Sequence, residues 1–384
     1  MSEYYFDHAA SAPRRDEVAD AMAPWMHGVV GNPSGSHRAA RLARKAVEDA
    51  RDVVAQLTGA APGNVVFTAG GTEACTLAVA GTVRAYHRRM GRAVIVHPPT
   101  EHHAVLDAIT MTTSQLGDTS AHVVGVDSDG VVDLEELTRA LAGPSVALVS
   151  VMAANNETGV AAPLDAVATM AKAAGVLSHS DVVAAALWTD LASLAPDLDM
   201  LSLCGHKIGG PVNSGALVLR SNIAVDALMP GGGQEKGRRG GTVDVAACVG
   251  FATALALANA EREQVNARVT AYRDELATAL SQLEGCVVTA SSARRTPGTV
   301  HLTFAGIASD ELLFLLDQAG LYASAAASCS SGAVVSSHVL TAMGISPERA
   351  RGSLRLSMGA ETTARDVEAA IDIISAAHRR LRGD

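Results

Sequence analysis

The chain has 384 residues, of which 48% are apolar and 18% charged, and its formal net charge is −10. This acidic balance and an aromatic content of 3% argue against nucleic-acid binding as the main role, because that role favours basic patches and aromatic stacking platforms. At roughly 150 residues per domain, the length favours two to three domains with ample material for a buried core.

The N-terminal segment, residues 1–7, has no basic stretch followed by an apolar one, so we expect no signal peptide and a cytoplasmic protein. From there to about residue 255, short apolar runs alternate with helical patterns, including a helix that begins at Glu73. Continuous apolar strands between helices favour a parallel sheet that is covered on both faces. We therefore interpret residues 15–255 as one large α/β domain. The expected strands are 64–68, 93–97, 146–152, 175–180, 200–203 and 215–219.

The C-terminal third shows a different pattern of elements. Residues 246–258 form the longest apolar run, which is too short for a membrane span of roughly 18 residues or more and predicts a buried core helix. A separate polar helix is expected at 261–283. Strand-like segments at 286–289 and 299–304 then alternate with helices, and a C-terminal helix is expected at 363–382. This mixture predicts a smaller α+β domain.

The five cysteines are widely spaced and never form a C-x-x-C pair. An odd number in this arrangement argues against a disulfide framework or a zinc knuckle, so we expect any working cysteine to act as a single thiol. Cys75, Cys248 and Cys286 lie in apolar contexts, where a free cysteine is a small buried side chain. Cys329 stands among Ala, Ser and Gly residues, which is typical of an accessible loop and favours a reactive thiol.

Two residues of candidate chemical importance each follow an expected strand. Lys207 lies in Cys204-Gly205-His206-Lys207, directly after the strand 200–203, and ligands of parallel sheets bind at the carboxyl ends of strands. Partial burial there lowers the pKa of a lysine and exposes a neutral amine that can form a Schiff base, although a lone lysine is more often a surface residue. Asp181 ends the strand 175–180, and a carboxylate at that depth needs a cationic partner, either a structural salt bridge or a cationic ligand.

Two further features follow other strands. The turn Gly70-Gly71-Thr72 opens a helix, whose free backbone amides favour a phosphate, although such a turn is often only a tight turn. His102 follows the strand 93–97, where an imidazole can stack on a flat ring. A metal site at 101–103 is disfavoured because the H-x-x-x-H and H-E-x-x-H spacings do not occur. We expect these four features to meet at one edge of the sheet.

Ordered motifs extend the pattern over nearly the whole chain. In this order and over this span they resemble the cysteine desulfurase family, in the class V, fold-type I group of enzymes that use pyridoxal phosphate (PLP). The motifs are Phe6-Asp7-His8-Ala9-Ala10, Gly31-Asn32-Pro33-Ser34, Glu101-His102, Asn155-Asn156-Glu157-Thr158-Gly159, Gly205-His206-Lys207, Gly231-Gly232-Gly233-Gln234-Glu235, Arg239-Gly240-Gly241-Thr242, Ser328-Cys329-Ser330-Ser331-Gly332, Ser337-His338-Val339-Leu340 and Ser353-Leu354-Arg355-Leu356-Ser357.

The resemblance implies an α/β fold of the fold-type I PLP-dependent class, with a mainly parallel sheet in the large domain. The large domain would be 15–255, and 1–14 with 256–384 would form the small α+β domain that carries the Cys329 loop. It further implies a homodimer whose active site lies between the domains at the subunit interface.

The resemblance also implies the role of each matching residue. Lys207 would hold PLP and later shuttle protons, Asp181 would bind the ring nitrogen and His102 would stack on the ring. Gly71, Thr72, Cys204 and His206 would lie at the phosphate, with Thr242 reaching it from the partner subunit. Asn156 and Arg355 would orient the substrate, Arg355 by forking onto the α-carboxylate. Cys329 would attack the sulfur of L-cysteine as a thiolate, which leaves a Cys329 persulfide and releases L-alanine.

The sequence departs from the family pattern at two cofactor positions. Ala184 stands where a glutamine that bonds the phenolic oxygen of PLP is usual, and Cys204 stands where Ser or Thr is usual and is a weaker donor. Both an active desulfurase and a specialised PLP-dependent lyase or transaminase, acting on another sulfur-containing or β-substituted amino acid, are compatible with these changes. A PLP-fold accessory protein is the non-catalytic alternative, against which Lys207 and Asp181 speak.

The long Cys329 loop matches the family's longer-loop group, which hands sulfur to a partner. A sulfur-acceptor protein is therefore expected, for iron–sulfur cluster assembly or for thio-modification. No membrane and no direct nucleic-acid partner are expected.

Overall fold

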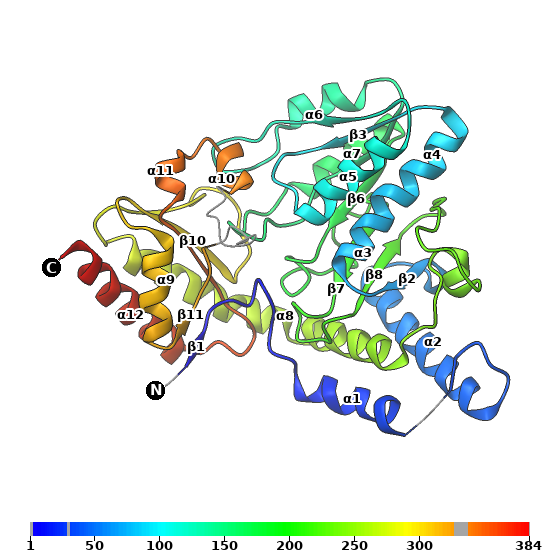
Figure 1. The fold of residues 1–384 in the computed structure, drawn as a ribbon, viewed down its shortest axis with the longest axis horizontal. Coiled ribbons are helices and arrows are strands. Elements are labelled where there is room, and N and C mark those ends of the chain that lie inside the picture. The colour runs from blue at the N-terminus through cyan, green and yellow to red at the C-terminus, as the bar shows by residue number, and fades with distance from the viewer. Residues whose placement is uncertain (1–2, 29–30, 326–336, 384) are drawn as a thin grey trace.

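The structure is a computed structural model, and it describes residues 3–28, 31–325 and 337–383 (Figure 1). A seven-stranded sheet forms its larger part, with the strand order β2-β8-β7-β6-β5-β3-β4. This confirms the prediction of a mainly parallel sheet, because every neighbouring pair from β7 to β4 is parallel. Its strands are β2 (Val65–Thr68), β3 (Ala93–His97), β4 (Thr119–Val123), β5 (Val146–Ser150), β6 (Leu177–Asp181), β7 (Met200–Cys204) and β8 (Gly215–Leu219).

Strand β8 is the exception, since it runs antiparallel to both of its neighbours, β7 and β2. Parallel strands need a crossover of a dozen or more residues, and the segment between Cys204 and Gly215 is shorter than that. The short connection instead returns the chain beside β7 in the opposite direction. It begins with the turn that carries Lys207, which therefore lies at the carboxyl end of β7.

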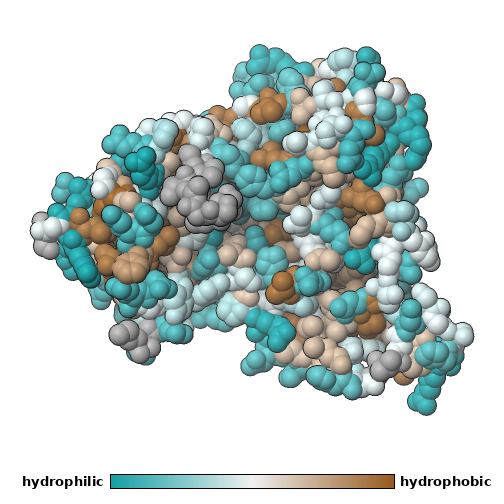
Figure 2. All heavy atoms as spheres, viewed as in Figure 1, coloured by the Kyte–Doolittle hydropathy of each residue, from teal (hydrophilic) through white to brown (hydrophobic). Residues whose placement is uncertain are grey.

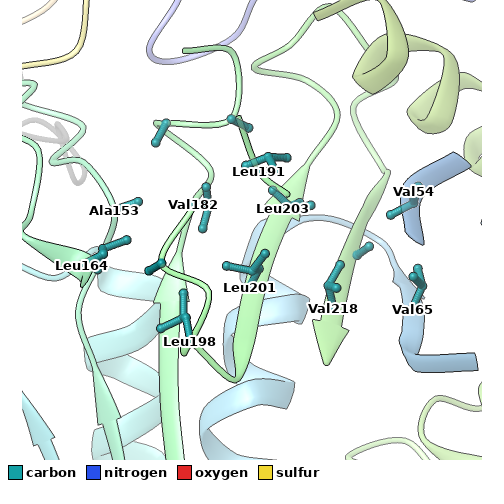
Figure 3. Close-up of a cluster of buried hydrophobic side chains, with 14 of the residues drawn as sticks. Val54, Val65, Ala153, Leu164, Val182, Leu191, Leu198, Leu201, Leu203 and Val218 are labelled. Atoms are coloured by element: carbon teal, nitrogen blue, oxygen red, sulfur yellow. The ribbon is translucent and has the colours of Figure 1, made fainter. Parts of the chain in front are cut away.

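Helices cover both faces of the seven-stranded sheet (Figure 1). Alternate residues of β7 point to opposite sides: Leu201 and Leu203 join one core cluster and Met200 the other. Figure 3 shows the first cluster, in which Leu201, Leu203 and Val218 of the sheet lie with Val54 of α2 nearby. This face carries α1 (Asp16–His27), α2 (Arg38–Thr58), α6 (Leu134–Leu141) and α7 (Leu164–Ala174), and the other carries α3 (Gly71–Thr76), η2 (Leu77–Gly81), α4 (Thr82–Met90) and α5 (His103–Gln115).

Helix α8 (Val245–Leu280) is one continuous helix, so the prediction of two separate helices was wrong. No Gly or Pro lies between the apolar and the polar stretch, so nothing in the chain breaks the helix there. The change of composition marks a change of surroundings instead. Ala254 and Leu255 pack in the core of the large sheet, whereas Val269 and Leu276 pack in a second core.

The second core holds the C-terminal part of the chain together with Phe6 from the N-terminus. A three-stranded antiparallel sheet, β12-β10-β9, lies there beside the two-stranded parallel sheet β1-β11. On this basis we propose the division into 15–255 and 1–14 with 256–384 as the two domains. The elements are β1 (Tyr4–Tyr5), β9 (Cys286–Val288), β10 (Thr299–Phe304), α9 (Ser309–Gln318), β11 (Leu321–Tyr322), α10 (His338–Ala342), α11 (Pro347–Ala350), β12 (Ser353–Ser357) and α12 (Ala364–Arg382).

No helix in the described ranges is both long and apolar enough to cross a bilayer. On the face drawn in Figure 2, the brown apolar residues lie in small separate groups.

A buried ion pair joins the short helix η3 (Gln234–Gly237) to α2, and the same carboxylate binds the backbone of β2. The Arg51 guanidinium donates two hydrogen bonds to the Glu235 carboxylate at 2.7 and 2.8 Å, and Glu235 also accepts one from the backbone N–H of Phe67 at 2.9 Å. Only 2% of the Glu235 side chain is exposed. Removing Arg51 therefore leaves a buried charge without its partner, which is costly.

We expect Arg51→Met to lower the free energy of unfolding by about 3 kcal/mol or more. Adding Glu235→Gln should recover a large part of that loss, because no unpaired charge remains. Urea unfolding of the cofactor-free proteins measures both changes. Arg88→Met is the matched control: its pair with Asp226 is exposed, and its loss should stay under about 1 kcal/mol. A loss from Arg51→Met that is no larger than this control would contradict the prediction.

Candidate active site

A cleft of about 1110 Å³ lies at the carboxyl ends of the parallel strands. It brings together most of the residues that the sequence singled out, and Ser324 and Ala325 add to its wall from the C-terminal part of the chain. Cys329 lies in 326–336, outside the described residues. The predicted site residues that line the cleft are Gly71, Thr72, His102, Asn156, Asp181, His206, Lys207 and Arg355.

Lys207 follows β7 through a turn that only glycine can make at position 205. A Cβ on Gly205 would lie against the Ser214 hydroxyl and 2.9 Å from the Pro211 carbonyl oxygen. The turn is closed by a hydrogen bond from Gly205 N–H to the Ser214 carbonyl at 2.9 Å. Among the described residues, none makes a hydrogen bond or an ion pair with the Lys207 ammonium, which is half-buried and faces the cleft. The amine is therefore open to a ligand.

Asp181 is the last residue of β6 and is only 5% exposed. Its Oδ1 accepts a hydrogen bond from the backbone N–H of Val183 at 2.9 Å. No cationic side chain in the described part of the chain forms an ion pair with it. A buried carboxylate without a cation is costly, so the arrangement suits a cationic group supplied by a ligand.

A chain of buried hydrogen bonds lies behind Asp181. The fully buried Cys75 thiol lies beside the side chains of Asp181 and Ser202. The Ser202 hydroxyl lies 2.8 Å from Nε2 of His179, and Nδ1 of His179 lies 2.9 Å from the Ser150 hydroxyl. Burial lowers the pKa of His179 to about 4, so the ring is neutral and one of its nitrogens donates while the other accepts. These bonds restrain the rear side of the site without adding a charge.

The phosphate-type turn lies at the start of α3, which continues through η2 and α4 as one helical run. Gly70 has a φ of +148°, and a Cβ on Gly71 would lie 2.8 Å from Cγ2 of Val183. The first amides of a helix have no partner within it, and here they open onto the cleft beside Thr72. Glu73 also lines the cleft, but its carboxylate is already occupied: it accepts hydrogen bonds from the Ala69 N–H at 2.6 Å and from the Arg239 guanidinium at 2.9 Å.

His102 is held as the cap of α5, since its Nδ1 accepts a hydrogen bond from the Ala104 N–H at 3.0 Å. Burial lowers the pKa of His102, and the nearby Lys207, His103 and His338 lower it further against the opposing effect of Asp181. The neutral ring therefore carries its proton on Nε2. A fixed, uncharged ring on the cleft wall is suited to stacking on a flat ligand.

Arg355 lies on β12 and is 5% exposed. Its Nη2 donates to Oδ1 of Asp7 at 2.6 Å and its Nη1 donates to the Asn156 carbonyl at 3.1 Å, while its Nε is buried without a partner in the described residues. Asp7 belongs to the opening motif, but the sequence did not indicate this contact, because the two residues are far apart in the chain. The guanidinium thus keeps N–H donors that are not engaged in these two bonds, and a planar set of donors of this kind is suited to bind a carboxylate.

Two predicted cofactor residues are placed differently. Cys204 is fully buried and is not among the described residues that line the cleft; burial raises the pKa of its thiol to about 11. Thr242 is exposed and lies outside the cleft of its own chain. Ala184 lines the cleft and offers no donor. Sequence reasoning did not assign a role to Glu101, a fully buried carboxyl beside His102.

The geometry supplies four kinds of group around one cleft: a helix start for an anion, a buried carboxylate for a ring cation, a flat imidazole, and an amine that has no partner among the described residues. These groups fit PLP, which carries a phosphate, a basic ring nitrogen, a planar ring and an aldehyde. Within the described residues no cluster of three or more histidine, cysteine or acidic side chains is arranged to hold a metal ion.

Comparisons with known proteins point the same way. The model of the class-V aminotransferase family matches residues 4–370. An IscS-like cysteine desulfurase of Mycobacterium tuberculosis is 41% identical, covering 98% of this chain and 97% of the relative. A solved structure of a NifS-like protein is 30% identical with a TM-score of 0.91, and the match covers 100% of this chain and 100% of that one. A structure titled SspA in complex with cysteine is 28% identical with a TM-score of 0.80, covering 94% of this chain and 100% of that one.

Proposed function

The chain belongs to the class-V aminotransferase family and, within it, to the PLP-dependent cysteine desulfurases, and on that premise we propose how its own residues carry out the reaction. We propose that it converts L-cysteine to L-alanine and leaves the sulfur on Cys329 as a persulfide. The observation that supports this most directly is the Lys207 amine, which has no partner among the described residues and faces a cleft shared with Asp181, Gly71 and Arg355.

The cofactor would be held by residues from four strand ends. Lys207 would bind the aldehyde carbon, Asp181 the ring nitrogen and His102 one face of the ring. The amides at Gly71 and Thr72 would bind the phosphate, with His206, whose buried Nδ1 has no partner in the described residues, beside it. Cys204 would support this turn from behind as a buried thiol, and Ala184 leaves the phenolic oxygen to another donor.

PLP, when bound, supplies an electron sink that makes the bonds at the substrate's α- and β-carbons easier to break. The chain's own groups supply the proton transfers: Lys207 Nζ takes the proton from Cα and returns one to the product. A half-buried amine is suited to this work because it is held close to the reacting carbon. His102, neutral and donating through Nε2, limits the ring to one orientation.

The substrate would be fixed at its carboxylate. Arg355 binds it through the fork that now contacts Asp7 and the Asn156 carbonyl, and Asn156 adds a side-chain contact from the cleft wall. Ala325, the last described residue before Cys329 in the chain, lines the same cleft as Arg355. Three residues lie between Ala325 and Cys329, and the four Cα–Cα steps that join them span at most about 14 Å.

The sulfur transfer balances without an outside oxidant. The Cys329 thiolate attacks the sulfur of L-cysteine, an S–S bond forms as the substrate's Cβ–S bond breaks, and the bond pair stays on the substrate carbon. A proton then completes the methyl group of alanine. L-cysteine and one thiol thus become L-alanine and one persulfide. A thiol reductant later releases the outer sulfur as sulfide and is oxidised to a disulfide, or an acceptor thiol takes that sulfur as a persulfide and leaves the Cys329 thiol.

The test is the product balance of the PLP-loaded enzyme with L-cysteine and a thiol reductant. We expect alanine and sulfide in equal amounts. Pyruvate and ammonia with sulfide would instead identify a β-elimination, and a keto acid without sulfide would identify a transaminase. Either of those outcomes would replace the desulfurase proposal by the corresponding alternative.

We expect Asp181→Asn to weaken PLP binding by about tenfold or more and to slow turnover by a larger factor. The amide leaves the ring nitrogen without a negative partner, so the ring loses its proton and much of its electron-withdrawing power. Cofactor titration by absorbance and initial rates of alanine release measure the two effects. Asp199→Asn is the control, because Asp199 lies one residue before β7 and contacts Ser178 and Ser221, and it is not among the described residues that line the cleft. Equal PLP affinity of wild type and Asp181→Asn would contradict the assignment.

The remaining parts of the proposal concern partners. The exposed position of Thr242 is compatible with a contact to the phosphate in a partner subunit, and so supports a homodimer. A sulfur-acceptor protein would collect the persulfide sulfur, for cluster assembly or thio-modification. The cytoplasmic location stays a prediction.

A further inference from the structure

Glu101 is a buried carboxyl that the proposed reaction does not use. It is 0% exposed and immediately precedes His102 in the segment between β3 and α5. Its Oε1 accepts a hydrogen bond from the backbone N–H of Met152 at 2.5 Å. Its Oε2 is buried and has no partner among the described residues. Ionisation of a carboxyl that has one bonded oxygen and one buried oxygen without a partner is costly, which favours the protonated form.

The surroundings of Glu101 contain a second carboxylate and no cationic partner. The same backbone segment separates the two acids: Met152 N–H binds Glu101, and the next residue, Ala153, donates its N–H to the Asp181 carbonyl at 2.8 Å. Within the described part of the chain, no ion pair includes Glu101. Burial and, to a smaller extent, the nearby Asp181 raise the pKa of Glu101 to about 8 against the opposing hydrogen bond from Met152.

The other titratable groups near Glu101 come from three further elements. Cys75 of α3 lies behind Asp181, and burial keeps its thiol protonated by raising its pKa. His102 and His103 follow Glu101 directly, and His102 is neutral through burial. His338 of α10 binds the main-chain carbonyl of Glu101 through Nε2 at 2.9 Å and packs on the His103 ring. Asp181 is therefore the charged side chain that affects the Glu101 carboxyl most.

We propose that Glu101 is a positioning residue for Asp181. Glu101 carries a proton and stays uncharged while the site is empty, and it loses this proton more readily when a cationic ring nitrogen binds Asp181. This rests on the proposed function. A negative charge on the buried Glu101 would be repelled by the Asp181 carboxylate, so ionisation of Glu101 is disfavoured while the site is empty. A bound cation cancels that charge, and ionisation of Glu101 then costs less. The proton leaves Oε2 for solvent, and no electrons are transferred.

The linkage has a definite sign. A cation that eases the loss of the Glu101 proton must, by reciprocity, bind more tightly once that proton has gone. PLP affinity of the wild type should therefore rise with pH relative to a variant that carries a permanent neutral group. Glu101→Gln is that variant, because it keeps the size and the acceptor for the Met152 N–H but cannot ionise. A merely structural glutamate would shift affinity equally at every pH.

The experiment measures the dissociation constant of PLP from cofactor-free wild type and Glu101→Gln by absorbance, at about pH 6.5 and about pH 9 on either side of the Glu101 pKa. The protonation of PLP itself cancels in the ratio of the two constants. We expect a ratio near one at the lower pH and a wild type that binds at least about fivefold tighter at the higher pH. A ratio that does not change with pH would overturn the proposal.

Glu157→Gln is the matched control. Glu157 is also a buried glutamate whose pKa burial raises, but its Oε2 accepts a hydrogen bond from Ser337 at 2.5 Å. Its replacement should leave the pH dependence of PLP affinity unchanged. A pH-dependent ratio of the same size in this control would assign the effect to buried glutamates in general and overturn the specific role of Glu101.

A second measurement keeps the proposal testable if Glu101→Gln does not fold. In the Glu157→Gln background, infrared difference spectra at about pH 8 should show a protonated buried carboxyl that diminishes when PLP binds. An unchanged carboxyl signal would contradict the coupling. Failure of the wild type to bind PLP at all would instead contradict the proposed function, so the two failures are distinguishable.

Discussion

Lys207→Ala is expected to lower the rate of alanine formation by about a thousandfold or more. The cleft holds the Lys207 amine half-buried and without a partner among the described residues, so its loss removes both the covalent anchor for PLP and the group that moves protons at Cα. The effect is large because one residue serves two consecutive steps, and no other lysine lines the cleft in the described part of the chain.

The measurement is alanine release from L-cysteine under PLP saturation, with the absorbance of the bound cofactor recorded in parallel. Lys45→Ala is the matched control, since Lys45 is an exposed helix residue paired with Asp49, and its activity should stay within about twofold of wild type. Retention of more than a few per cent of the wild-type rate in Lys207→Ala, with PLP saturating, would show that Lys207 is not the amine of this reaction.

Cys329→Ala is expected to abolish alanine and sulfide formation while PLP binding stays unchanged. No other group in the proposal accepts the substrate's sulfur, and a hydrocarbon side chain cannot replace a thiolate as nucleophile. The residue lies outside the described part of the structure, so this prediction rests on the sequence motif and the wall that ends at Ala325. Single-turnover alanine formation and mass detection of the persulfide on the wild type check it.

Cys286→Ala serves as the control for the loss of a thiol. Cys286 lies on β9, and burial raises the pKa of its thiol to about 11, so it stays a poor nucleophile near neutral pH. Its replacement should leave alanine formation close to wild type. Continued turnover in Cys329→Ala would favour a lyase or transaminase that releases sulfur or nitrogen without this thiol.

Much of the site was predictable because each chemical residue follows an apolar strand. The strands at 93–97, 215–219 and 299–304 have the predicted bounds, and β6 and β7 differ from prediction by only one or two residues. Buried parallel strands appear in the sequence as continuous apolar runs, so the residue at which each strand ends can be recognised. Polar residues at the carboxyl ends of such strands indicate the edge of the sheet at which ligands bind. The alignment of Gly71, His102, Asp181 and Lys207 around one cleft follows from that rule.

Other features needed the tertiary structure. Strand β4 escaped prediction because it is mostly exposed and polar, and the antiparallel direction of β8 depends on the space available to its connection. The two expected helices form the single helix α8, whose first part packs in one core and whose second part packs in the other. These outcomes are set by contacts between distant segments, which leave no local pattern in composition or periodicity.

Strand periodicity and motif order are local properties, so the amino-acid sequence alone indicates which chemical groups this protein has and at which strand ends they lie. The charge and the pairing of these groups depend on the fold. Arg355 contacts Asp7, which is far away in the chain, and the buried Glu101 is close enough to Asp181 for the charge of one to affect the other. Burial and neighbouring charges set protonation, and both arise from residues that the fold alone brings together.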